Sequence, residues 1–99
     1  MYRTLRLCAH GGGFEAIPSS KLTVDLPRVR AALESAGFPV LDARVMLIVS
    51  FAPEVTISRS GRLLFKTGDQ GAAQAAFDRL VQLLSSKGLL PSGSDAPIG

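Results

Sequence analysis

The sequence has few of the residues from which most enzyme sites are built. One cysteine, one histidine, one tyrosine and no tryptophan occur among its 99 residues. A single cysteine excludes an intramolecular disulfide and an all-cysteine metal site. No apolar run approaches the roughly 20 residues of a membrane-spanning helix, so we expect no membrane partner. The sequence predicts no cofactor, no metal site and no catalytic residue, which favours a non-enzymatic protein.

Cys8 and His10 are the one pair that brings a nucleophile type close to a base type. Residues two apart on a strand share a face, so a thiolate–imidazolium pair is geometrically feasible and keeps an enzyme hypothesis open. Glu15 is the one acid near enough in sequence to orient such a pair. A lone cysteine at the end of a strand is more often a small packing residue, which is the interpretation we favour.

The composition describes one mildly basic domain. The net charge is +3, 46% of the residues are apolar, and 19% are charged. This balance can fill a core, and it permits contact with nucleic acid or an acidic partner without requiring it. We predict a single α+β domain over residues 1–90 and a disordered tail, rich in proline, serine and glycine, over 91–99. The N-terminal segment is too short and too alternating for a signal peptide, so we expect a cytoplasmic protein.

Hydrophobic periodicity predicts four strands and two helices. The predicted strands cover residues 2–8, 43–51, 54–59 and 62–67, with a loop over 14–23 and a tight turn at Ser60-Gly61. One helix runs from Leu26 to Ala36 behind the cap Asp25, and the other lies between the cap Asp69 and Gly88.

The order β-α-β-β-β-α predicts an α+β fold, with a four-stranded antiparallel sheet and two helices packed on one face. Both helices have apolar stripes to bury, and one sheet face can cover both. The predicted core is Leu5, Leu7, Leu33, Leu47, Val49, Val55, Ile57, Leu63, Phe65, Phe77, Leu80 and Leu84.

Strand alternation assigns the remaining side chains to the uncovered side of the sheet. The candidate binding residues there are four cations and three apolar side chains, namely Arg6, Arg44, Arg62 and Lys66 with Met46, Ile48 and Leu64. Apolar residues ringed by cations mark a contact surface more often than bare solvent. The phosphates of a nucleic acid would bind the cations, while the apolar centre of the face would lie against its sugars or base edges. The alternative is a protein–protein or homodimer interface on the same face.

Residues 54–68, EVTISRSGRLLFKTG, carry a resemblance to a known family. The segment resembles the hairpin of a TATA-binding-protein repeat, in which a β-branched strand, a Ser-Gly-Lys/Arg turn and a strand ending in Thr-Gly follow one another. Residues 72–84 are similar to the alanine-rich helix that closes that repeat. The resemblance implies a unit that forms half of a saddle and contacts nucleic acid. The same unit occurs in a bacterial type of ribonuclease H, where it binds the hybrid substrate.

Two features depart from the family. Proteins of the family fuse two repeats into one saddle, whereas this chain is long enough for one repeat. The phenylalanines that the family wedges between base pairs have no counterpart, because Phe51 and Phe65 fall on the inward side of their strands. A lone unit recovers the saddle shape by pairing with a second copy along an edge strand, and we predict a weak homodimer through residues 2–8 or 62–67.

Overall fold

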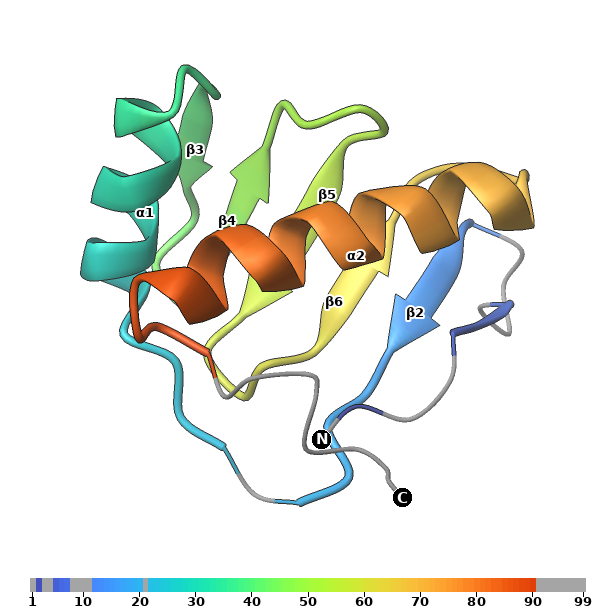
Figure 1. Cartoon of the computed structure of the whole chain (residues 1–99), viewed down its shortest axis with the longest axis horizontal. Helices are drawn as coiled ribbons and strands as arrows, with labels where there is room; N and C mark the ends of the chain where they lie inside the picture. Colours follow the sequence, from blue (N-terminus) through green and yellow to red (C-terminus); the bar gives the residue numbers. More distant parts are fainter. Residues whose placement is uncertain (1, 3–4, 8–11, 21, 91–99) are drawn as a thin grey trace.

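The sheet positions most of the candidate binding surface, and Figure 1 shows this sheet behind the longer of two helices in a computed structural model. The structure describes residues 2, 5–7, 12–20 and 22–90. Among these residues, one antiparallel sheet has six strands in the order β1-β2-β6-β5-β4-β3. The strands are β1 (Arg6–Leu7), β2 (Phe14–Ala16), β3 (Val40–Asp42), β4 (Met46–Val49), β5 (Val55–Ser58) and β6 (Leu63–Phe65), and the helices are α1 (Leu26–Ser35) and α2 (Gln70–Ser86).

The α+β class and the antiparallel sheet are confirmed, but the four-stranded sheet and the order β-α-β-β-β-α are wrong. β2 lies where we expected a loop, and it pairs with both β1 and β6. The predicted strand 43–51 is shortened to β4, and the residues before it form the additional strand β3. β6 is therefore internal to the sheet, so residues 62–67 are not the edge through which we predicted dimerisation.

A turn between β3 and β4 explains why the strand expected at 43–51 begins late. Arg44 has a φ of +75°, a left-handed conformation that few non-glycine residues adopt. Its backbone N–H donates to Asp42 Oδ1 at 2.8 Å, and aspartate commonly closes turns in this way. The chain reverses here, so β3 folds back onto β4. Val45 is 58% exposed beside the turn, although alternation with Leu47 in a strand over 43–51 would direct it toward the helices.

Both helices begin at the aspartates predicted to cap them. An oxygen of Asp25 accepts a hydrogen bond from the Arg28 backbone N–H at 3.2 Å, and one of Asp69 accepts from the Gly71 N–H at 2.9 Å. These bonds satisfy N–H groups that have no partner within a helix. In the part of the chain that the structure describes, neither helix has the length and apolar character to cross a membrane.

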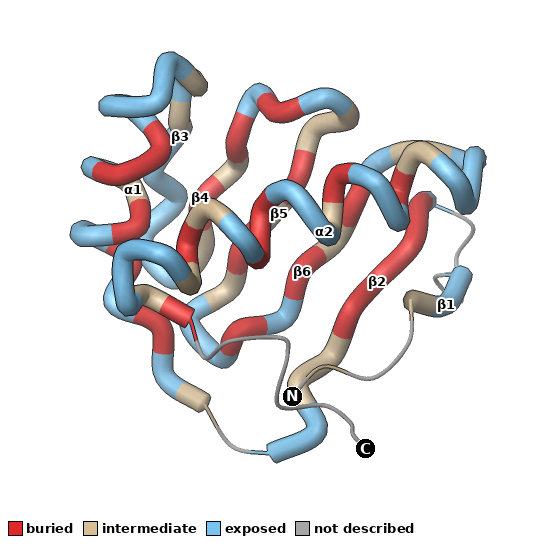
Figure 2. Tube along the Cα trace, in the orientation of Figure 1, coloured by how far each residue is buried: buried red, intermediate tan, exposed pale blue. Residues whose placement is uncertain are grey.

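The core lies between the sheet and the two helices, as the buried segments in Figure 2 show. Alternate residues of the central strands are buried, namely Leu47, Val49, Val55, Ile57, Leu63 and Phe65. Both helices contribute to the same cluster, α1 through Val29 and Leu33 and α2 through Leu80 and Leu84. The two helices therefore cover one face of the sheet and leave the other uncovered.

Three of the twelve predicted core residues are not fully buried. Leu5 and Phe77 are half-buried and pack against the edge of the cluster. Leu7 is 59% exposed because β1 has two residues and lies at the margin of the sheet, where no helix covers it.

Gly13 lets β2 approach the centre of the sheet. Its φ is +151°, and a Cβ at this position would lie 2.1 Å from the carbonyl oxygen of Phe65. Real Cβ atoms do not come so close to backbone, so only glycine fits here without moving a strand. β2 then places Glu15 in the sheet, where its carboxylate changes the charge balance of the candidate site.

Candidate functional site

Strand register organises the side of the sheet turned away from the helices, which we call the open face. Residues directly opposite one another in adjacent strands share a face. One such row crosses the sheet from β1 to β3 and contains Arg6, Glu15, Leu64, Thr56, Ile48 and Leu41. The charged residues of this row stand near one edge and the apolar residues near the other, so the two halves of the face differ in chemistry.

The apolar half consists of Leu41, Met46 and Ile48 on strands β3 and β4, with Leu64 beyond Thr56. Leu41 is 64% exposed, and the other three side chains are half-buried. A solvated sheet face usually carries polar residues at such positions. Contiguous exposed apolar side chains with a polar border are typical of a contact surface.

The charged half is built on Glu15, whose side chain is only 6% exposed. The Arg6 Nε atom donates to one carboxylate oxygen at 3.0 Å, and the Arg62 Nη2 atom donates to the other. The hydrogen bond from Arg62 is the main cause that lowers the pKa of the Glu15 carboxyl, and burial opposes it. The carboxylate is thus ionised at neutral pH, and it holds two guanidinium groups on the open face.

Lys66 is also paired with an acid on this face. Its Nζ atom lies 3.6 Å from a carboxylate oxygen of Glu54, and both side chains are about half exposed. Three predicted binding cations therefore have acidic partners within the face itself. Their positive charge is largely balanced, which weakens the attraction of the face for a polyanion.

Six of the seven predicted site residues lie on the open face, and Arg44 does not. Arg44 is in the β3–β4 turn, where it lines a pocket together with Arg59, Asp25 and Asp42 near the start of α1. Two acids balance two arginines in this pocket. Phe51 and Phe65 are buried on the helix side, as their strand positions predicted.

Two residues of the face were missed in the sequence. Glu15 falls within the loop predicted over 14–23, because β2 has only three residues and so few do not show a clear alternation. Leu41 lies outside every predicted strand, because Asp42 separates it from the apolar run that follows. The signal that could have predicted β2 is the triplet Phe-Glu-Ala after a glycine, in which two apolar residues alternate with one polar residue as in a strand.

Among the described residues, no three histidine, cysteine, aspartate or glutamate side chains are grouped so that they could hold a metal ion. Cys8 and His10, on which the enzyme hypothesis depends, lie outside the described residues, as does the tail expected at 91–99. The hypothesis for these two residues stays a prediction.

No protein-family model matches the chain, and no match was found among the curated proteins or the solved structures. The geometry of the open face and of the pockets is therefore the basis on which a function can be argued.

Proposed function

We propose that the chain is a non-enzymatic protein-interaction module and that its open face binds a second copy of the chain. The observation that carries this proposal is the apolar half of the face, formed by Leu41, Met46 and Ile48 at the β3–β4 edge. In a two-fold pair, the apolar half of one copy can lie on the same half of the other, because a two-fold axis brings identical patches together.

The open face is large enough for such a contact. Figure 1 views the molecule down its shortest axis, and the two longer extents are 29 Å each. A standard interface buries roughly 800 Å² on each partner, and the side of the molecule that carries the open face can supply this area together with the turns that border the strands. The ion pairs of Glu15 and Glu54 would lie at the rim, where charged groups add specificity more than affinity.

Nucleic-acid binding is the second candidate, and one observation favours it. Two guanidinium groups, those of Arg6 and Arg62, share the single carboxylate of Glu15. Each guanidinium has five N–H donors, so donors remain for a phosphate. The resemblance to a TATA-binding-protein repeat points the same way, and its sequence segment corresponds to β5, β6 and α2. We rank this candidate second because acids on the same face balance its cations.

Sedimentation across micromolar to millimolar concentrations tests the proposal. We expect a monomer–dimer equilibrium in which Leu41→Lys weakens association by about tenfold or more, because a two-fold interface would bury two added charges. Ala75→Lys is the matched control. Ala75 is exposed on α2, so a lysine at this position adds the same charge away from the open face. A strictly monomeric protein at millimolar concentration contradicts the proposal, as does an equal effect of both variants.

Fluorescence anisotropy with a labelled DNA duplex and a labelled RNA–DNA hybrid tests the second candidate. Our proposal predicts weak binding that disappears as salt is raised. Submicromolar binding at physiological salt, reduced by Arg6→Gln and unchanged by Leu41→Lys, would instead identify the open face as a nucleic-acid surface.

A further inference from the structure

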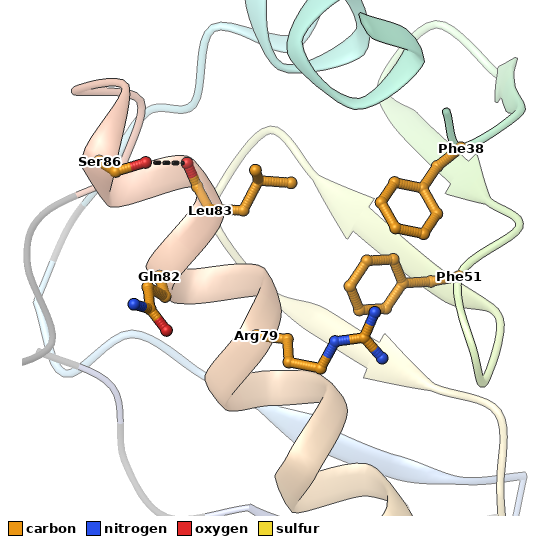
Figure 3. Close-up of a pocket in the computed structure, with 6 residues that line it drawn as sticks. All are labelled: Phe38, Phe51, Arg79, Gln82, Leu83 and Ser86. Carbon is orange, nitrogen blue, oxygen red and sulfur yellow. Dashed lines mark hydrogen bonds between the residues drawn. The ribbon is translucent and has the colours of Figure 1, made fainter. Parts of the chain in front are cut away.

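A pocket on the helix side of the molecule has a chemistry that the open face does not share. It has a volume of about 400 Å³ and is lined by Phe38, Phe51, Arg79, Gln82, Leu83 and Ser86. Figure 3 shows Leu83 of α2 directed toward Phe38, and the Arg79 side chain extending across to Phe51. The pocket therefore lies between one side of α2 and the two phenylalanines that flank β3 and β4.

The two phenylalanine rings form one wall of the pocket. Their centroids are 4.7 Å apart, and their planes are inclined at 50°. Phe51 is buried and Phe38 is half-buried, so both rings are held in place while part of their surface stays accessible. Rigid aromatic walls of this kind favour a flat, apolar ligand, which stacks at little cost in conformational entropy.

Arg79 supplies the polar group of the pocket. Its guanidinium carbon lies 5.0 Å from the centre of the Phe51 ring, in a cation–π contact. Among the described residues, no acidic side chain forms an ion pair with Arg79, and none lines this pocket. The guanidinium N–H groups can therefore donate to an anion, for which Arg is geometrically suited.

We infer that this pocket binds a small aromatic acid, whose ring packs against Phe38 and Phe51 and whose carboxylate accepts hydrogen bonds from Arg79. The charge of the pocket favours an anion, since the one charged group among its described lining residues is the Arg79 cation. The volume sets the size, because about 400 Å³ lies at the lower end of the range for small-molecule sites and suits one or two fused rings. This site is separate from the open face and does not depend on the function proposed for it.

The probe we choose is 2-naphthoate, and its neutral alcohol, 2-naphthalenemethanol, is the control ligand. Titrations followed by NMR should show saturable shifts for Phe38, Phe51 and Leu83 with 2-naphthoate. We expect the alcohol to bind about tenfold more weakly, since it lacks the charge-assisted hydrogen bonds to Arg79. Shifts elsewhere that do not saturate, or equal affinity for both ligands, would overturn the inference.

A pair of matched variants tests the role of the cation. Arg79→Gln should weaken 2-naphthoate binding by about tenfold and leave binding of the alcohol within about twofold. Arg28→Gln removes one positive charge from an exposed position on α1 that does not line the pocket, and it should leave both affinities unchanged. Both side chains are exposed, so neither change threatens the fold. An equal loss in the two variants would show a general charge effect and would also overturn the inference.

Discussion

Removing the negative charge of Glu15 should destabilise the fold by a measurable and limited amount. In Glu15→Gln the side chain keeps its size and one acceptor oxygen, but an NH2 group replaces the other acceptor, so one charge-assisted hydrogen bond, worth about 1.5–3 kcal/mol in a favourable setting, is lost together with the negative charge. The partners Arg6 and Arg62 have side chains that are 68% and 51% exposed, so water can solvate both guanidinium groups after the change. Because of this exposure the loss of stabilisation is smaller than for a fully buried pair, and we expect the free energy of unfolding to fall by about 1–2 kcal/mol at pH 7.

The effect should depend on pH in a direction that the lowered pKa of Glu15 determines. Because the pKa of this carboxyl is lower in the folded chain than its ordinary value of 4.5, folding favours the ionised form. The stabilisation is fully present above the unfolded pKa and is lost as the pH falls through the folded pKa. The difference between wild type and Glu15→Gln should therefore shrink as the protein is acidified below pH 4.5.

Urea unfolding at a series of pH values from 7 downward measures this difference. Asp78→Asn is the control, since Asp78 is exposed and its carboxylate accepts a hydrogen bond only from the Gln74 amide, at 3.1 Å, in the contacts described. We expect that control to change the unfolding free energy by less than about 0.5 kcal/mol. Equal stability of Glu15→Gln and wild type at pH 7, or a difference that persists in acid, would refute the reasoning.

Two further predictions concern Gly13 and Tyr2. Gly13→Ala should lower the unfolding free energy by about 2 kcal/mol or more, because its Cβ would meet the Phe65 carbonyl oxygen at 2.1 Å, whereas Gly12→Ala meets nothing within 4 Å and should be near neutral in the same urea assay. Burial raises the pKa of Tyr2 to about 12, and its hydroxyl donates to the Gly61 carbonyl oxygen at 2.6 Å. The raised pKa means that folding favours the neutral phenol. The contribution of this phenol to the free energy of unfolding is therefore present below the ordinary pKa of 10.0 and is lost as the pH rises toward 12. Ultraviolet absorbance follows this residue without interference from another tyrosine or tryptophan, and a midpoint at the ordinary value would contradict the prediction.

The parts of the fold that sequence predicts well are those with dense local signals. The β5–β6 hairpin has alternation on both sides of Ser60-Gly61, and Gly61 does take a positive φ of +89° in the turn. The helices have aspartate caps and apolar stripes at helical spacing. Each of these signals depends on contacts between residues close in sequence, so each can be evaluated without knowing the rest of the fold.

The two additional strands could not be predicted for different reasons: β2 depends on a partner that is distant in sequence, and β3 depends on an unfavourable turn. β2 has only three residues, and its neighbour β6 is about 50 positions later in the chain. β3 is equally short and pairs with β4 across a turn that requires Arg44 to take a left-handed conformation, which sequence propensity disfavours. In both cases strand pairing outweighs the local preference of the residues, so a prediction from local signals finds only four strands.

The same two strands decide what the open face can bind. β2 places Glu15 on the face, at a position predicted to be in a loop. Its carboxylate forms ion pairs with Arg6 and Arg62, two of the cations expected to contact phosphate. β3 brings in Leu41, which enlarges the apolar area at the opposite edge. A polyanion would have to compete with a carboxylate that is already buried between Arg6 and Arg62, and would gain little from the apolar half. A protein surface meets neither obstacle, because it can cover the apolar half and leave the ion pairs of Glu15 intact at the rim.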